Sequence, residues 1–183
     1  ASLSLYAVRS AEPVGLLLVG GREVKHDYIP PSRRSKAAIF DLLARAKPGG
    51  KANLQQAFLR LMSMLKQKSI VILISDWMEE PSEWGPSLEM LAAAGHDIRV
   101  LHLYSQGEWS LDLPDSVKLF SYESAEEINL DIEKVKDEFN DIVSNYQQEV
   151  ERWALKSRSI WSMAAIEESL VVHNDKIENT LDA

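Results

Sequence analysis

One run of apolar residues, Ile70-Val-Ile-Leu-Ile74, limits the fold of this 183-residue chain more than any other stretch. The run is far shorter than the roughly 20 residues that cross a membrane, and its β-branched residues favour a strand. Because no polar residue interrupts it, the run is typical of a strand covered on both faces in a parallel sheet. It stops at Ser75 and Asp76, which places a carboxylate at the carboxyl end of a buried strand.

Strand-like and helical segments alternate along most of the chain. We expect strands at residues 14–20, 22–29 (stopping at Pro30-Pro31), 69–75, 97–104, 117–122 and 159–165, with residues 127–130 either a hairpin partner or simply extended. We expect helices at residues 35–47, 54–65 and 88–94, a long one that Asp131 caps and that runs to Trp153, and a peripheral closing helix at 166–183. This order implies an α/β fold of the Rossmann type, with a mainly parallel, doubly wound sheet flanked by helices.

The composition fits a single soluble domain over residues 1–183. The formal net charge is −8 and the Lys and Arg residues are scattered, so we expect no nucleic-acid partner. The absence of cysteine excludes disulfides and thiolate metal sites. A cytoplasmic location is the default expectation for such a chain.

Asp76 is the first candidate site residue, because ligands of open parallel sheets lie outside the carboxyl ends of the strands. With hydroxyls or waters as further oxygen donors, Asp76 would hold a hard cation. Alternatively, it only accepts hydrogen bonds from amides of its own loop. Glu79, Glu80 and Glu83 follow, and they would either extend an acidic site or lie on a solvated loop.

Three tryptophans, Trp77, Trp84 and Trp109, fall in predicted loops at the same end of the sheet. Clustered indoles make a partner-binding patch when they are exposed. When they are buried, the same side chains cover the core. The sequence leaves both interpretations open.

The chain lacks the sequence motifs of several common catalytic and nucleotide-binding sites. Gly49-Gly50 precedes a predicted helix, but the sequence continues as Lys51-Ala52 and lacks the spacing of a P-loop. The four histidines are isolated in the sequence, and Ser75 lacks the flanking glycines of a nucleophile elbow. We therefore expect that the protein is not an enzyme.

Several segments occur in a particular order along the chain. They are Pro-Val-Gly-Leu-Leu-Leu-Val-Gly at 13–20, the strand ending at Pro30-Pro31, Pro-Gly-Gly-Lys-Ala-Asn-Leu at 48–54, Ile-Val-Ile-Leu-Ile-Ser-Asp-Trp at 70–77, Gly-His-Asp-Ile-Arg-Val-Leu-His-Leu at 95–103, Gly-Glu-Trp-Ser-Leu-Asp-Leu-Pro at 107–114, and Ser-Tyr-Glu before Ile-Asn-Leu-Asp within 121–131. This order resembles that of the DUF58 family, whose conserved region is a von Willebrand factor A-like (vWA) domain. The resemblance reaches to about Trp153 and is weaker beyond.

The resemblance implies a metal-ion-dependent adhesion site built from three loops: a DxSxS segment after the first strand, a Thr in a Gly-Gly-Thr loop, and the Asp after the Leu-Ile-Ser strand. In this chain only Asp76 matches. Ala52 stands at the Thr position and has no side-chain oxygen, although Asn53 beside it offers a carbonyl. We therefore expect a degenerate site and no cofactor, with Mg²⁺ or Mn²⁺ bound only if residues upstream of Ala1 complete the site.

The DxSxS strand would precede Ala1, so we expect the sheet to lack the family's usual first strand. Its loss would expose strand edges and apolar surface, which favours aggregation. We expect a complementing chain, a second copy in a homo-oligomer or a rearranged sheet to fill the gap. The resemblance also implies upstream membrane helices that would anchor the full-length protein.

By resemblance, the leading function is a non-enzymatic protein-protein interaction domain of vWA type that works beside a MoxR-type AAA+ ATPase. The alternative is a metal-assisted hydrolase or phosphoryl-transfer enzyme that uses Asp76. A structural fragment with no activity of its own is a third interpretation. The expected partner-binding surface comprises Ala52, Asn53, Asp76, Trp77, Trp84 and Trp109.

Overall fold

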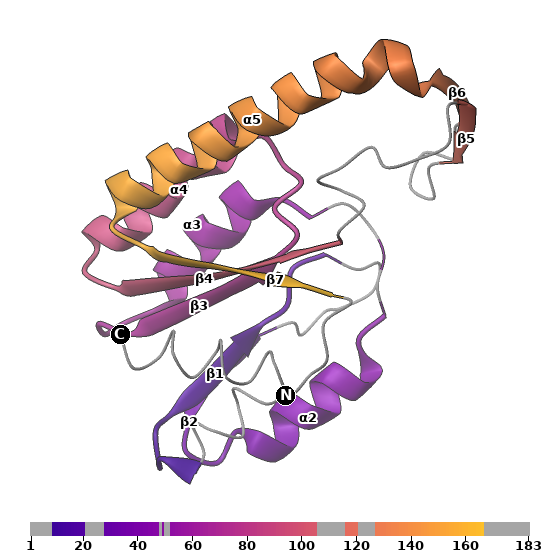
Figure 1. Ribbon diagram of the computed structural model, residues 1–183. Helices are drawn as coiled ribbons and strands as arrows, with labels where there is room; N and C mark the ends of the chain where they lie inside the picture. The colour runs from indigo at the N-terminus through magenta and orange to yellow at the C-terminus, as the bar shows by residue number, and fades with distance from the viewer. Residues whose placement is uncertain are drawn as a thin grey trace.

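The centre of the molecule is a parallel sheet of three strands (Figure 1). The computed structural model describes residues 9–20, 28–47, 49, 52–105, 116–120 and 127–166. The strands lie in the order β3 (Ile70–Ser75), β4 (Asp97–Tyr104) and β7 (Ile160–Ala165). This arrangement confirms the predicted mixed α/β fold with a parallel sheet and flanking helices.

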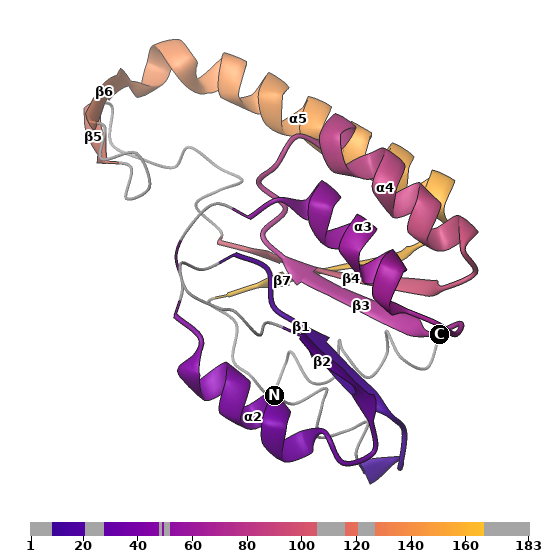
Figure 2. The same cartoon turned by 180° about the vertical axis from the view of Figure 1, so that it is seen from behind.

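Three helices cover one face of this sheet. They are α3 (Leu54–Met64), α4 (Pro81–Ala93) and α5 (Ile132–Ser157). The second helix lies between the other two, because α4 packs against both α3 and α5. The two opposite views show the same layer above the strands (Figures 1 and 2).

Local capping signals explain where two of these helices begin and end. The Asn53 side chain accepts a hydrogen bond from the Gln56 amide at 2.8 Å and so caps α3. Pro81 occupies the first turn of α4, where a missing N–H costs nothing. Gly95, with φ of 89°, follows α4 as predicted. The sequence expectation of a helix from Leu88 was too short, because Pro86 inside the helix hid its first turns.

The N-terminal strands form a separate unit and correct a prediction. The strands β1 (Val14–Leu17) and β2 (Tyr28–Ser32) pair antiparallel in their own two-stranded sheet. All four residues of β1 are half-buried, so β1 is not the doubly covered parallel strand that its apolar run suggested. The strand β2 does not stop at Pro30 as predicted but runs through Pro30 and Pro31. An outer strand tolerates proline, because a missing N–H on its unpaired side breaks no hydrogen bond of the sheet.

The helix α2 (Lys36–Arg45) follows this hairpin and confirms the helix predicted there. The oxygen of the buried Ser35 hydroxyl lies 2.5 Å from the carbonyl oxygen of Val14 and 2.7 Å from that of Ser32, so its one hydrogen is shared between these two acceptors. One hydroxyl therefore joins the start of the helix to both strands of the hairpin. Figures 1 and 2 show the hairpin and α2 on the opposite side of the central sheet from α3, α4 and α5.

A second hairpin lies at the far end of the long helix α5 (Figure 1). It consists of β5 (Ser116–Phe120) and β6 (Glu127–Asp131), paired antiparallel. Residues 127–130 are therefore a hairpin partner, which was one of two alternatives. The helix starts at Ile132, directly after the residue expected to precede it. The closing helix predicted at 166–183 lies outside the described residues beyond position 166.

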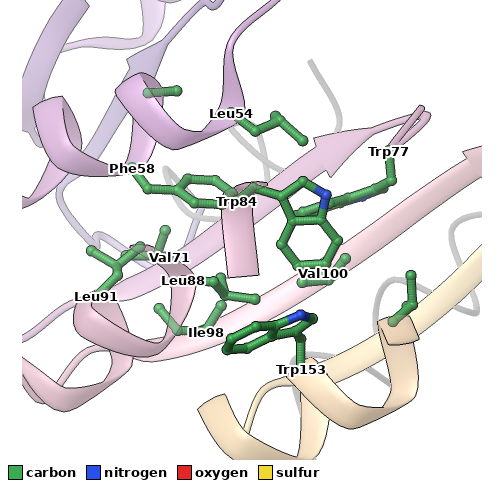
Figure 3. Close-up of a cluster of buried hydrophobic side chains, with 12 residues drawn as sticks. Leu54, Phe58, Val71, Trp77, Trp84, Leu88, Leu91, Ile98, Val100 and Trp153 are labelled. Atoms are coloured by element: carbon green, nitrogen blue, oxygen red, sulfur yellow. The ribbon is translucent and has the colours of Figure 1, made fainter. Parts of the chain in front are cut away.

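The core lies between the sheet and the helical layer (Figure 3). Its largest members with no exposed surface are Trp77 and Trp84. The cluster also contains Leu54, Phe58, Val71, Leu88, Leu91, Ile98, Val100, Val150 and Trp153. Only one face of β3 contributes to it.

The strand β3 is the end strand of the parallel sheet within the described residues, and it is not covered on both faces as its apolar run suggested. Its burial alternates: Val71 is 7% exposed, whereas Ile70 and Ile74 are 58% and 52% exposed. An uninterrupted apolar run conceals such alternation, because both faces carry the same kind of side chain. The strand β3 therefore has one apolar face that is exposed.

Candidate functional site

Asp76 emerges where β3 ends, as predicted, and its side chain is exposed. The Met78 amide donates to its Oδ1 at 3.4 Å, and the Ser75 hydroxyl donates to the same oxygen at 3.3 Å. Both contacts are long for hydrogen bonds. The carboxylate therefore steadies its own loop through one oxygen, which is the simpler of the two interpretations, and remains open to solvent.

Trp77 gives this loop its shape. Its backbone has φ of 57°, in the left-handed region, and its indole is completely buried. Holding a bulky residue there costs roughly 1–3 kcal/mol, so the surrounding packing must favour it. The ring meets Trp84 at 4.9 Å and Trp161 at 4.8 Å between centroids. The turn sends one side chain into the core and leaves its two neighbours, Asp76 and Met78, outside.

The expected accessible tryptophan patch is not formed by Trp77 and Trp84. Both are 0% exposed, and Trp84 belongs to α4, not to a loop (Figure 3). The Trp84 indole N–H donates to the Glu79 carbonyl oxygen at 3.0 Å, so its polar atom is satisfied inside the protein. Indoles carry too much apolar surface to stay exposed when helices offer them a core. Trp109 lies outside the described residues.

Glu79 joins the loop after β3 to the loop before α3. Its carboxylate accepts from the Leu54 amide, at 3.0 Å to Oε1 and 3.2 Å to Oε2. A negative charge at a helix N-terminus is stabilised by the free amides there. The contact brings Ala52 and Asn53 to the same end of the sheet as Asp76, as the sequence analysis predicted.

The residues described here do not fit a divalent cation. Ala52 has no side-chain oxygen, and the side-chain oxygen of Asn53 accepts a hydrogen bond from the Gln56 amide as the cap of α3. No group of three or more His, Asp or Glu side chains with metal-binding geometry occurs in the described part of the chain. Hard cations take several oxygen ligands, and here Asp76 is the only matching donor. The expectation that this chain binds no Mg²⁺ stays a prediction.

Two titratable groups lie under the Asp76 loop. The buried imidazole of His102 on β4 has a lowered pKa, because burial disfavours its charged form more than hydrogen bonding and charge at Asp76 favour it. Burial also raises the pKa of Tyr146, and the negative charges of Asp76 and Glu80 raise it further. The loop therefore lies over an imidazole and a phenol whose uncharged forms are favoured by burial.

The sequence pattern gave no sign that Tyr146 on α5 belongs to this site. Its hydroxyl donates to the Trp77 carbonyl oxygen, across 69 positions of sequence. The hydrogen bond ties α5 to the left-handed turn. No local pattern predicts it, because it depends on where a helix and a loop meet.

The sequence pattern also gave no sign that Met78 is an exposed residue of this site. Its side chain is 72% exposed, and in the sequence it lies between Asp76 and Glu80, which are also exposed. We call Asn53, Asp76, Met78 and Glu80 the Asp76 surface. It presents a flexible apolar side chain among acids, on a loop fixed from below by Trp77.

Comparison with solved structures agrees with this fold. A conserved hypothetical protein, BatB from Bacteroides thetaiotaomicron, superimposes with a TM-score of 0.51 at 12% identity, covering 100% of this chain and 88% of that chain. An aerotolerance-related membrane protein from Bacteroides fragilis NCTC 9343 gives a TM-score of 0.46 at 15% identity, over 93% of this chain and 80% of the other. At these identities the first likeness shows the fold alone.

Within the described residues, no helix combines the length and hydrophobicity needed to cross a bilayer.

Sequence comparison gives the family. A search of curated proteins returned no match. The family described as "Protein of unknown function DUF58" matches residues 1–149, which is most of the chain. This protein therefore belongs to the DUF58 family.

Proposed function

We propose that this chain is a non-enzymatic interaction domain of vWA type, and that its Asp76 surface binds a protein partner. A MoxR-type AAA+ ATPase is the first candidate, as the family resemblance implies. The observation that carries the proposal is the exposure of Met78. Its side chain is 72% exposed, although the preceding residue, Trp77, is fully buried.

The support comes from the contrast between a fixed backbone and an exposed apolar side chain. Trp77 is packed in the core, Tyr146 holds its carbonyl oxygen, and Glu79 joins the loop to α3. A loop held in three places loses little conformational entropy when a partner binds. Methionine adapts its shape to varied apolar pockets, which suits a binding surface.

The surrounding charges describe the complementary partner. Asp76 and Glu80 flank Met78, and the exposed Glu83 follows one turn into α4. A matching surface would hold an apolar pocket with Lys or Arg at its rim, because opposite charges at a rim speed and orient association. This is the chemistry to look for on the ATPase.

The test measures binding of the 183-residue chain to the purified MoxR-type ATPase of the same organism, with ATP and with ADP. Met78→Asp should raise the Kd about 30-fold or more, since burying a methionine contributes roughly 2 kcal/mol. Met90→Asp is the matched control: Met90 is 50% exposed near the other end of α4. Equal binding by both variants, or no binding of the unaltered chain, overturns the proposal.

The alternative, a metal-assisted hydrolase or phosphoryl-transfer enzyme, draws on the closeness of the His102 imidazole to Asp76. It requires an accessible base or a second carboxylate beside Asp76, whereas His102 is only 3% exposed. A phosphatase and esterase screen separates the two functions. Turnover that Asp76→Asn abolishes, together with unchanged partner binding by Met78→Asp, would favour the enzyme.

A further inference from the structure

The sign of the charge differs between two parts of the chain. The cations are scattered along the sequence, yet residues 1–53 contain nine Lys or Arg and four Asp or Glu, whereas residues 54–183 contain 11 and 24. The protein therefore has a positive N-terminal part and a strongly negative remainder. Such asymmetry is typical of proteins that hold one side against an anionic surface.

The positive charge of the N-terminal part is concentrated around α2. Residues 28–47 contain five Lys or Arg and only one acid. All five cations are exposed, and they lie at both ends of the helix: Arg33, Arg34 and Lys36 at its start, and Arg45 and Lys47 at its end. We call these five residues the α2 basic surface.

Most of these cations are not neutralised by the protein itself. The single acid of the segment, Asp41, pairs with Arg45 one turn further along the helix. Within the described residues, no ion pair involves the other four cations of the α2 basic surface. Charged side chains of this kind stay at the surface of a folded protein, because burying them unpaired costs too much free energy. The four cations are therefore available to an anionic partner.

Small and apolar residues cover the outer face of α2 between the two groups of cations. Ile39 is completely buried, whereas Ala37 and Ala44 lie on the opposite side of the helix and are exposed. Phe40 lies beside them and is 36% exposed. Short side chains let the helix approach a flat surface closely. Cations around a phenylalanine are also typical of helices that lie in the headgroup layer of a bilayer.

The acidic remainder of the molecule favours one orientation at an anionic surface. Figures 1 and 2 show α2 on one side of the central sheet and α3, α4 and α5 on the other. Exposed acids on that helical layer include Glu83, Glu89, Asp137, Glu138 and Asp141. An anionic surface attracts the α2 side and repels the helical layer, so the molecule approaches it with α2 first.

We propose that the α2 basic surface binds the anionic headgroups of a lipid bilayer, with Phe40 against the headgroup layer and the helical layer facing away. The contact is peripheral, because it involves exposed side chains only. A nucleic acid is the other common polyanion, but proteins recognise it through polar side chains or stacked aromatic rings, and the outer face of α2 is built largely of alanine. The proposal goes beyond the proposed function, because it concerns different residues and a different partner.

The first test measures binding of the 183-residue chain to vesicles by co-sedimentation at low salt. Vesicles of equal parts phosphatidylcholine and phosphatidylglycerol should bind the chain, whereas vesicles of phosphatidylcholine alone should not. Added salt should weaken the binding, because it screens exposed charges. Arg33→Gln with Arg34→Gln should raise the Kd about 30-fold, since each cation near an anionic leaflet contributes about fivefold.

A second double variant controls for the change in net charge. Lys66→Gln with Lys68→Gln removes the same charge from two exposed lysines between α3 and β3, away from α2. It should leave the Kd within about twofold of the original, because its lysines do not face the bilayer in the proposed orientation. Circular dichroism confirms that both double variants are folded.

The second test determines which side of the molecule meets the lipid, and the absence of native cysteine makes it possible. Phe40→Cys is labelled with a polarity-sensitive fluorophore. Its emission should shift to shorter wavelength on the mixed vesicles, and lipids that carry a quencher near the headgroup should quench it. Leu59→Cys is the matched control, because Leu59 is 43% exposed on α3, in the layer that faces away. Its label should neither shift nor be quenched.

The outcomes separate a lipid surface from other anionic partners. Binding to mixed vesicles that is weakened by the arginine variant and kept by the lysine variant supports the proposal, as does quenching at position 40 alone. No binding to mixed vesicles at low salt overturns it, and binding to a short DNA duplex instead would assign the surface to a nucleic acid. Equal weakening by both double variants, or equal quenching at positions 40 and 59, also overturns it.

Discussion

The two faces of β3 are made of the same kinds of side chain but have different surroundings. On one face Val71 is 7% exposed and packs in the core with Trp84. On the other, the flanking residues Ile70 and Ile72 are 58% and 36% exposed. The comparison shows that apolar character determines that a segment becomes a strand, whereas the neighbouring elements determine which of its faces is covered.

The largest effect should come from the covered face. Trp84→Ala should lower the free energy of unfolding by about 3–5 kcal/mol, because it opens a cavity among Trp77, Trp161 and the helices. Chemical denaturation followed by circular dichroism measures this change. Trp84→Phe should cost clearly less, and an equal loss for both variants would mean that the hydrogen bond to Glu79, not the packing, holds the indole.

A second change tests how tightly the helical layer above this face is packed. A Cβ atom added at Gly85 would lie 2.2 Å from ring atoms of Trp153 on α5. Gly85→Ala should therefore destabilise the protein by about 1–3 kcal/mol, although alanine normally favours a helix over glycine. Thermal denaturation measures the change. A more stable variant would show that α4 and α5 are not in close contact at this position.

Acid should affect the covered face through His102, which lies opposite Ser75 at the carboxyl end of the sheet. Its pKa is lowered in the folded protein, chiefly by burial, so the unfolded chain binds the proton more readily. Stability is therefore fully present above the unfolded pKa of about 6.5 and is lost as the pH falls through the interval below it. Urea denaturation of His102→Phe should show a smaller loss than the unaltered chain between neutral and mildly acidic pH. An identical pH dependence would contradict the assignment.

The smallest effect should come from the open face. Ile70→Thr should change the free energy of unfolding by less than about 0.5 kcal/mol, because its side chain is already more than half exposed. Its matched neighbour Val71→Thr should cost about 1–3 kcal/mol, because it buries a hydroxyl among apolar groups. Both are measured by urea denaturation. Equal costs would mean that the two faces are covered alike.

Much of the fold could be predicted because its signals are local. The strand expected at residues 97–104 is β4, and the one expected at 159–165 is β7 within one residue. Asp76 could be placed at a strand's carboxyl end for the same reason, since the apolar run stops there. The start of α4 could not, because Gly85 and Pro86 usually interrupt helices.

The place of Asp76 at the end of β3 could be predicted, but the exposure of the side chains around it could not. The sequence left open whether Trp77 and Trp84 form an exposed patch, and both proved to be core residues. Met78 gave no signal, because exposure of a single methionine depends on the left-handed turn before it. The Tyr146 hydroxyl, which belongs to the distant helix α5, donates to the Trp77 carbonyl oxygen in that turn.

The sequence by itself determined the α/β class, the parallel strands and the carboxylate at the end of β3. These features follow from apolar periodicity and capping residues, which act over a few neighbouring positions. Only the tertiary structure decided that β1 joins a separate hairpin, that Trp77 points inward and that one face of β3 stays open. Those outcomes depend on which distant segments pack together, and an unbroken apolar run is compatible with cover on one face or on both.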